Sequence, residues 1–336
     1  MNSAAIQLFD HHHAIYTSSI ENAATITQSA RILPTLSALA KVRLNALVLV
    51  TAGVGFIVAL PTAPNWMLLL WTLLGTAASA ASAAMFNQLL ESRRDGLMRR
   101  TEMRPLPRQH IGRPVVFIMA VILGYAGWAI LLWSVGWIPA TLATGNVLVY
   151  AAIYTPLKPI TSLNTLVGAV CGAIPPLVGW TAATGSLAPG AWVLAGILFV
   201  WQLPHFMALA WMYRVDYARG GFIMLPVVDP TGRITAQTMV LTSLILVPLG
   251  LLATIYGIAG WWFALAALVL GVWITLESFR FLLDRTDGRA RRVFLTSIIY
   301  LPLLLFVLVL DRGSVSPEAA LRNAPVFIPA EPKAPQ

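Results

Sequence analysis

The sequence predicts an all-α protein, a polytopic membrane helical bundle with nine transmembrane helices. Two features of its composition support this class, since 58% of its 336 residues are hydrophobic and only 10% are charged. A soluble domain carries roughly 25% charged residues, so this composition excludes an ordinary soluble fold. A third observation is that long apolar runs recur along the chain. Each run approaches the roughly 20 residues that one helix needs to cross a bilayer.

Nine apolar runs follow one another, and the connections between them alternate in length. The connections on one side are short, and three of them contain Gly136, Gly185 and Gly260. Those on the other side are longer and carry most of the charge. The expected spans are 44–63, 66–90, 114–135, 137–155, 163–183, 190–212, 235–257, 261–282 and 293–311.

The distribution of basic residues predicts the orientation of the bundle. Of the 22 Lys and Arg residues, 19 precede the first span, lie in the long connections or, for Arg280, stand at the span end next to one. The other three are Arg312, Arg322 and Lys333 in the C-terminal tail. By the positive-inside rule, the N-terminus and the long connections face the cytoplasm and the C-terminus lies outside. We therefore expect a multi-pass protein of the bacterial inner membrane, with an active site that opens to the cytoplasm.

The chain is expected to have three segments. They are a polar cytoplasmic tail over 1–40, a transmembrane domain over 41–311 and a disordered tail rich in Pro and Ala over 312–336. The net charge of +9 does not indicate nucleic acid, because the basic residues follow the membrane boundary. The single Cys171 lies in an apolar run, which excludes a disulfide framework and a cysteine metal site.

A polar helix face is predicted at the end of the second span. Asn87, Glu91 and Asp95 are four residues apart, so they lie along one side of a helix with about 6 Å of rise per step. Their oxygens suit Mg²⁺, and the arginines that follow suit a phosphate group bound to it. The pattern indicates a diphosphate site, and the alternative is a solvated helix end. The arginines are Arg93, Arg94, Arg99, Arg100, Arg104 and Arg108.

A second group of reactive residues lies in and after the sixth span. His205 falls inside the span, where an ionisable side chain is costly and indicates a functional site. The alternative is a neutral histidine that hydrogen-bonds to a neighbouring helix. Asp216 lies at the cytoplasmic end of the same span. It is the expected partner of the Asn87–Asp95 face if the second and sixth spans adjoin.

Four stretches together resemble a known family. They are Asn87 to Asp95 continuing to Pro107; Tyr154-Thr155-Pro156-Leu157-Lys158; Pro175-Pro176-Leu177-Val178-Gly179-Trp180; and Pro204-His205-Phe206 with Met224-Leu225-Pro226. The first resembles the UbiA superfamily of intramembrane prenyltransferases. The last two are more specific and resemble its haem-farnesylating branch, the protohaem IX farnesyltransferases. The resemblance covers about residues 40–311.

The resemblance implies a reaction and a set of site residues. Farnesyl diphosphate would transfer its farnesyl group to a vinyl group of haem B, giving haem O, the precursor of haem A in haem-copper oxidases, and diphosphate. His205 would act as an axial haem ligand or as a base that positions water for the product's hydroxyl group. The implied Mg²⁺ ligands are Asn87, Glu91, Asp95 and Asp216. The implied diphosphate-binding residues are Arg100, Arg104, Lys158, Tyr154, Tyr213 and Arg214.

One departure from the superfamily pattern concerns a second metal. Many relatives carry a second Asp-x-x-x-Asp motif after the sixth span, whereas here Asp216 is followed four residues later by Gly220. A second Mg²⁺ would have to rely on Asp216 with water, Tyr213 or Asp229.

Two other functions stay open at this point. A UbiA-type prenyltransferase for a quinone-precursor ring or a chlorophyllide would differ only in its acceptor. A multi-pass transporter would bury acids within its spans for ion coupling, whereas here the acids gather at one end. The expected partners are farnesyl diphosphate, haem B and the lipid bilayer, with haem A synthase and oxidase assembly factors as candidate protein partners.

Overall fold

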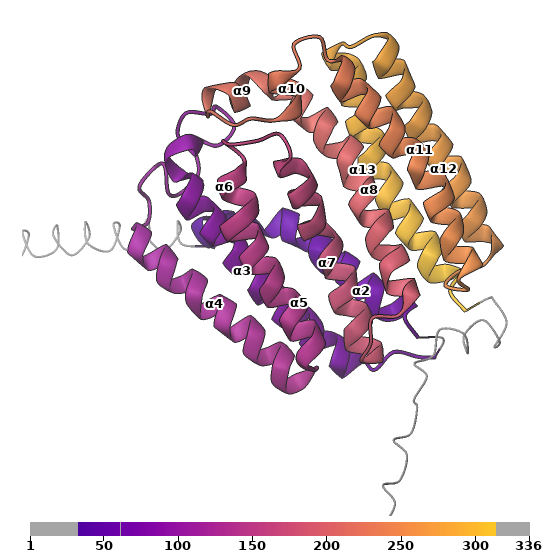
Figure 1. The fold of residues 1–336 in the computed structure, drawn as a ribbon. Coiled ribbons are helices and arrows are strands. Elements are labelled where there is room, and N and C mark those ends of the chain that lie inside the picture. The colour runs from indigo at the N-terminus through magenta and orange to yellow at the C-terminus, as the bar shows by residue number, and fades with distance from the viewer. Residues whose placement is uncertain (1–32, 61, 314–336) are drawn as a thin grey trace, which may run out of the picture.

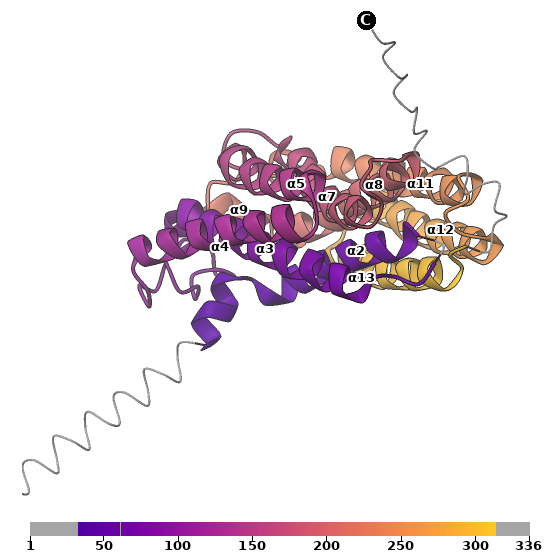
Figure 2. The same cartoon turned by 90° about the horizontal axis from the view of Figure 1, so that it is seen from below.

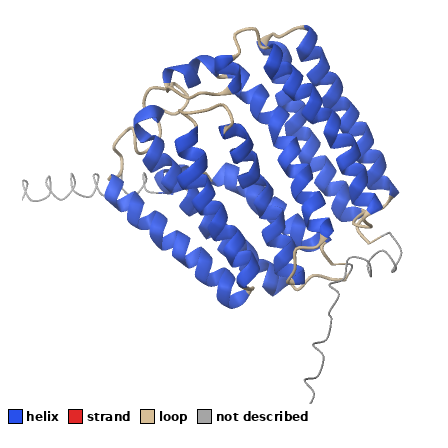
Figure 3. Ribbon diagram, viewed as in Figure 1, coloured by secondary structure: helices blue, strands red, loops and turns tan. Residues whose placement is uncertain are grey.

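The structure is a computed structural model that describes residues 33–60 and 62–313. In this part of the chain, long helices stand side by side and are joined by loops (Figures 1 and 3). The only extended pairing there is a single bridge between Ala259 and Arg312. The predicted all-α class is confirmed. The expected tails over 1–40 and 312–336 lie almost wholly outside the described residues and stay predictions.

The helices correspond closely to the predicted spans. In the described part, eight are long and apolar enough to cross a membrane, and α5, η1 and α6 together form one of them. A ninth span results if Leu33–Leu39 and α2, which meet at 55°, cross together, so the first span is bent rather than straight. The elements are α2 (Val42–Val58), α3 (Trp66–Asp95), α4 (Arg113–Ser134), α5 (Trp137–Leu148), the π-helix η1 (Val149–Tyr154), α6 (Thr155–Leu157), α7 (Asn164–Thr184), α8 (Pro189–Met212), α9 (Arg214–Arg219), α10 (Leu225–Val228), α11 (Arg233–Ile255), α12 (Trp261–Leu283) and α13 (Asp287–Leu310).

Local sequence signals determine several helix ends. The side chain of Asn65 caps α3 by accepting hydrogen bonds from the backbone N–H groups of Met67 and Leu68, both at 3.1 Å. Helix α7 ends at Gly185, whose φ of 71° lies in the left-handed region that glycine adopts without strain. These signals explain why the short connections fall where the sequence predicts them.

The helices form two rows around the centre of the bundle. Viewed from below, α5, α7, α8 and α11 lie along one side, and α3, α2 and α13 lie along the other (Figure 2). Helices α2 and α7 of the two rows approach each other closely. A Cβ atom on Gly179 would meet the carbonyl oxygen of Ala52 at 1.8 Å, and one on Gly55 would meet that of Pro176 at 2.3 Å. Small residues therefore bring the two backbones into contact, as is common in membrane helix pairs.

Three long connections meet at one end of the bundle, where α9 and α10 lie across the helix ends (Figure 1). The backbone N–H of Ile223 donates to the carbonyl of Lys158 at 2.7 Å, and Asn164 donates to the carbonyl of Ile223 at 3.0 Å. Arg94 donates to the carbonyls of Gly220 and Gly221 at 3.0 and 3.1 Å. The loops that follow α3, α6 and α8 are thus joined into one cap.

Candidate active site

The last turns of α3 present the predicted polar face. Asn87, Glu91 and Asp95 are all buried, with exposed fractions of 0%, 5% and 1%. The helix continues to Asp95, so the three side chains share one face of an unbroken helix. The alternative of a solvated helix end does not fit this burial, whereas the predicted diphosphate site stays a prediction.

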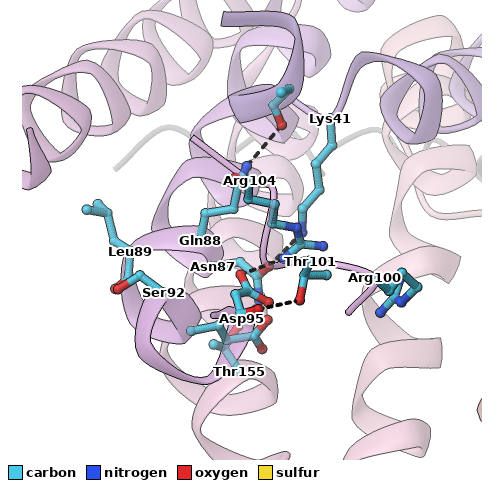
Figure 4. Close-up of polar contacts among 12 residues, drawn as sticks. Lys41, Asn87, Gln88, Leu89, Ser92, Asp95, Arg100, Thr101, Arg104 and Thr155 are labelled. Atoms are coloured by element: carbon cyan, nitrogen blue, oxygen red, sulfur yellow. Dashed lines mark hydrogen bonds and ion pairs between the residues drawn. The ribbon is translucent and has the colours of Figure 1, made fainter. Parts of the chain in front are cut away.

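Asn87 joins three segments that are far apart in sequence (Figure 4). Its Oδ1 accepts a hydrogen bond from Lys41 Nζ at 2.6 Å, and its Nδ2 donates to Thr155 Oγ1 at 3.0 Å. Lys41 stands at the break before α2, with a left-handed φ of 46°. The break aims its ammonium group at the α3 face rather than along the helix.

The two acids of α3 each face a cation. Glu91 forms an ion pair with Lys158 at 2.6 Å, and Asp95 forms one with Arg104 at 2.7 Å. Although burial favours the neutral amine, the Glu91 carboxylate holds the pKa of Lys158 above its usual value, so that Lys158 is charged at neutral pH. Its Nζ also lies 4.5 Å from the centre of the Tyr154 ring. The face therefore combines carboxylate oxygens with cationic donors.

Asp216 links the cap to this end of α3 through the connecting loop. Its Oδ2 accepts a hydrogen bond from the backbone N–H of Arg100 at 3.1 Å, and its Oδ1 lies 3.6 Å from Arg219. The Arg100 guanidinium lies over the rings of Tyr213 and Tyr217, 5.4 and 5.5 Å from their centres. Asp216 therefore holds Arg100 in the cap.

A divalent metal ion is implied by the sequence, and the donor set fits it in part. Asp95 has one buried oxygen, Oδ1, without a hydrogen-bond partner among the described residues. All candidate donors are carboxylate or amide oxygens, which Mg²⁺ prefers. Over residues 33–60 and 62–313, however, no three His, Cys, Asp or Glu side chains gather closely enough to hold a metal by themselves. The acids are paired with cations, so a metal would have to arrive with a further oxygen-rich ligand.

A cavity of about 320 Å³ lies between the helices and begins at Lys41, the residue that hydrogen-bonds Asn87 of the polar face. Lys41 and Tyr154 line its polar end, and Leu198 and Trp201 line it deeper among the helices. Its size lies at the lower end of the range for small-molecule sites, and most of its lining is apolar. An apolar chain bound there would have its polar end near Lys41, which contacts the α3 polar face through Asn87.

His205 lines the same cavity, and its hydrogen bond determines its tautomer. Its Nδ1 lies 2.8 Å from Ser297 Oγ, and that hydroxyl donates its own hydrogen to the Phe294 carbonyl at 2.6 Å. Ser297 Oγ therefore accepts from His205, which places the imidazole proton on Nδ1 and leaves a lone pair on Nε2. Trp201 and Phe294 stack on the ring with centroid distances of 5.2 and 4.9 Å. The imidazole is held as a rigid acceptor beside the cavity.

Comparison with known families and proteins identifies the relatives of this chain. Residues 48–305 match the UbiA prenyltransferase family. The protoheme IX farnesyltransferase of Solibacter usitatus (strain Ellin6076) is 41% identical over 285 residues, which are 82% of this chain and 97% of that protein. This chain belongs to the UbiA prenyltransferase family. It is therefore a prenyltransferase, and the transporter alternative is wrong.

Solved structures show that the fold is also that of the family. A digeranylgeranylglyceryl phosphate synthase superposes with a TM-score of 0.72 at 15% identity, covering 84% of this chain and 99% of that one. A UbiA homologue from Archaeoglobus fulgidus, bound to DMAPP and Mg²⁺, gives a TM-score of 0.58 at 15% identity, covering 82% and 99%. The UbiA-type fold predicted from the sequence is confirmed.

Two residues to which the sequence analysis gave binding roles, Arg214 and Asp229, form their contacts away from the α3 acids. Arg214 donates to Asp287 at the start of α13 and to the carbonyl of Trp211, both at 2.7 Å, and shares no described contact with the α3 acids. Asp229 caps α11 by accepting from the backbone N–H and hydroxyl of Thr235 at 2.8 and 3.0 Å. Both side chains have structural partners, which argues against their predicted binding roles.

Several residues of the site were missed by the sequence reasoning. Lys41 was counted only as a positive-inside charge, and Tyr217 and Ser297 received no role. Their contacts join residues 46, 117 and 92 positions apart, which no local pattern reveals. The one available signal was for Lys41, because a lysine directly before an apolar run can extend its side chain along the membrane boundary.

Proposed function

We propose that this protein is a protohaem IX farnesyltransferase, which transfers the farnesyl group of farnesyl diphosphate to a vinyl group of haem B and forms haem O. The observation that supports this best is a largely apolar cavity that is lined by Lys41, which hydrogen-bonds Asn87 of the α3 polar face, and by His205, whose Nδ1 is held by Ser297. A diphosphate, an apolar chain and a metalloporphyrin each find a suitable environment there. The relative in Solibacter usitatus carries the corresponding name.

The polar end can bind a diphosphate through charged donors. Arg104 and Lys158 offer charge-assisted hydrogen bonds, and Arg100 is held beside them by Asp216. When a diphosphate enters, its oxygens can replace the carboxylates as partners of these cations. Glu91 and Asp95 are then free to take another positive charge, so anion and metal binding are coupled.

Mg²⁺ is the metal that this donor set would accept, with Asn87, Glu91, Asp95 and Asp216 as its proposed ligands. When bound, the ion would act as a Lewis acid that stabilises the leaving diphosphate. The A. fulgidus homologue is bound to Mg²⁺ and DMAPP, which agrees with this assignment. Asp95 Oδ1, buried and without a hydrogen-bond partner among the described residues, is the most direct position for such an ion.

The acceptor binds deeper in the cavity, where His205 Nε2 can coordinate the haem iron. Neutral imidazole is a common axial haem ligand, and its other nitrogen usually donates a hydrogen bond that fixes the ring. The hydroxyl of Ser297 accepts that bond here. The apolar walls keep bulk water from the allylic cation until it meets the vinyl group.

Product analysis tests the function directly. The purified protein in lipid nanodiscs is incubated with haem B, farnesyl diphosphate and Mg²⁺, and the porphyrins are analysed by mass spectrometry. We expect haem O to accumulate with time and diphosphate to be released in equal amount. Parallel incubations with homogentisate, 4-hydroxybenzoate and chlorophyllide test the alternative acceptors. Prenylation of one of these acceptors, without any prenylation of haem B, would refute the proposal.

A further inference from the structure

A second, smaller chamber adjoins the main cavity. Its volume is about 30 Å³, and a buried water molecule needs roughly 10–15 Å³, so it has room for one or two waters. Its wall includes Thr76 and Ser79 of α3 and Ala143 of α5. Asn146 and Ala83 line both spaces, which places the chamber directly beside the main cavity.

The chamber has polar groups that the described part of the chain leaves unsatisfied. The Nδ2 of Asn146 donates to the Cys171 carbonyl at 3.0 Å, but its Oδ1 is buried and has no hydrogen-bond partner there. The buried hydroxyl of Ser79 also has none. Thr76 donates its hydroxyl hydrogen to the Thr72 carbonyl at 2.7 Å and keeps lone pairs free to accept.

These features together indicate bound water. A buried water typically makes two to four hydrogen bonds to groups that lack another partner, whereas an apolar space of this size stays dry. Three polar side chains face a chamber that is otherwise lined by Ala, Val and Pro. Leaving buried acceptors unpaired is costly, so their retention among helices of a membrane protein indicates that a water pairs with them.

We propose that this chamber holds the water that supplies the hydroxyl group of the product. The inference rests on the proposed function, because haem O carries a hydroxyl on the carbon next to the porphyrin ring. Ala83, on the chamber wall, lies four residues and about 6 Å from Asn87 along α3. The α3 wall of the chamber runs from Ala83 back to Thr76, so the water is stored between about 6 and 16 Å from Asn87 along the helix, beside the part of the main cavity that the apolar chain and its acceptor would occupy.

The chemistry balances with one water for each turnover. The C1–O bond of farnesyl diphosphate breaks, and its electron pair leaves with the diphosphate. C1 bonds to the terminal vinyl carbon, and the positive charge moves to the vinyl carbon next to the ring. The water oxygen bonds to that carbon, and the proton it releases passes to the diphosphate. Asn146 acts as a positioning residue, since its Oδ1 accepts one water hydrogen and aims the oxygen lone pair at the main cavity.

The test compares two products of one reaction in H₂¹⁸O. If no water reaches the cation, the cation loses a proton and gives a farnesylated haem that lacks the hydroxyl and is 18 mass units lighter than unlabelled haem O. Asn146→Leu removes the unsatisfied oxygen, and Ala143→Val fills the chamber from a wall that the main cavity does not share. We expect the ratio of hydroxylated to anhydrous product to fall at least tenfold in both variants, and the sum of the two products to be largely kept in Ala143→Val, which does not touch the main cavity.

The matched control is Thr144→Val, because Thr144 lies on the same helix, also has a buried hydroxyl without a partner among the described residues, and lines neither space. Its product ratio should equal that of the wild type. A wild-type product ratio in Ala143→Val, or an equal loss of both products in that variant, would overturn the proposal. Absence of any farnesylated haem from the wild type would instead refute the proposed function.

Discussion

Glu91 and Asp95 show how single residues can prepare a site for an anion and a metal together. Each carboxylate is buried and paired with one cation, Lys158 or Arg104. Neutralising an acid while its cation stays leaves unbalanced positive charge, which would bind diphosphate but no metal. Glu91→Gln and Asp95→Asn should therefore lower turnover by about 100-fold or more while the affinity for farnesyl diphosphate without Mg²⁺ rises.

Turnover measured against Mg²⁺ concentration, together with calorimetric titration of farnesyl diphosphate in excess chelator, checks both parts. Glu102→Gln is the matched control, since Glu102 is an exposed acid in the loop that follows α3. Full activity of Glu91→Gln, or of the wild type in chelator, would show that the acids serve only as structural ion-pair partners.

If the proposed function holds, Ser297 affects haem binding only through its contact with His205. Ser297→Ala removes the acceptor of the Nδ1 proton, so the imidazole can turn or change tautomer, and haem affinity should fall about tenfold. Ser297→Thr keeps the hydroxyl and should restore most of the affinity. Titration with haemin followed at the Soret band measures the effect.

A structural role for Ser297 makes a different prediction from a positioning role. Ser243→Ala serves as control, because it removes another buried hydroxyl, which bonds Ser278 at 2.9 Å and does not line the cavity. It should leave the Soret band unchanged. If Ser297→Ala and Ser243→Ala alter haem binding and thermal stability alike, Ser297 does not position His205.

At the residue scale, the sequence allowed us to predict only those arrangements of side chains that follow from helical spacing. Asn87, Glu91 and Asp95 could be placed on one face because only their spacing was needed. Arg214 could not be placed, because an arginine at a helix end can turn toward either neighbour, and here it pairs with Asp287. The proton on His205 also depends on α13, a helix almost a hundred residues away.

At the scale of elements, the contact between α2 and α7 explains a glycine that the sequence marked only by resemblance. Gly179 lets the α2 backbone approach, since a Cβ atom there would meet the Ala52 carbonyl oxygen at 1.8 Å. Gly179→Ala should therefore separate the helices and destabilise the protein by about 1–3 kcal/mol. Helix separation would also widen the main cavity, since both helices line it.

Thermal unfolding in detergent, followed by light scattering or intrinsic fluorescence, measures this loss. Gly145→Ala is the control, because a Cβ atom at Gly145 would meet nothing within 4 Å. It should unfold at or slightly above the wild-type temperature, since alanine favours a helix over glycine. Equal unfolding temperatures for both variants would mean that α2 can shift away from α7 without cost.

The element that the sequence described least well is η1. The expected span over 137–155 was a regular helix, but its last residues form the π-helix Val149–Tyr154. Tyr150 and Tyr154, 5.2 Å apart at their ring centres, both line the main cavity from this segment. π-Helical turns are common at functional sites, yet they have no composition signal, because they depend on what the side chains pack against.

At the scale of the whole molecule, the fold class and eight of the nine expected spans followed from hydrophobic length, whereas the first expected span corresponds to a bent helix pair in the described residues. The joining of three loops into one cap did not, because it depends on hydrogen bonds such as those from Arg94 to the carbonyls of Gly220 and Gly221. Loop packing of this kind has no periodic pattern. The charge distribution nevertheless placed all these loops on one side before their contacts were known.

The orientation of the bundle is a prediction for the whole molecule. The capped end carries most of the basic residues, so it should face the cytoplasm. Leu97 at that end is 61% exposed and Leu187, between α7 and α8, is 39% exposed, so a cysteine at either position can react without disturbing a packed contact.

A membrane-impermeant maleimide added to intact cells whose outer membrane has been made permeable should label Leu187→Cys and leave Leu97→Cys unlabelled. Inverted membrane vesicles should give the reverse, and the unmodified protein, whose Cys171 is buried, should stay unlabelled in both. Labelling of Leu97→Cys from outside would show that the bundle has the opposite orientation. The active site would then have to take its farnesyl diphosphate from the periplasmic side.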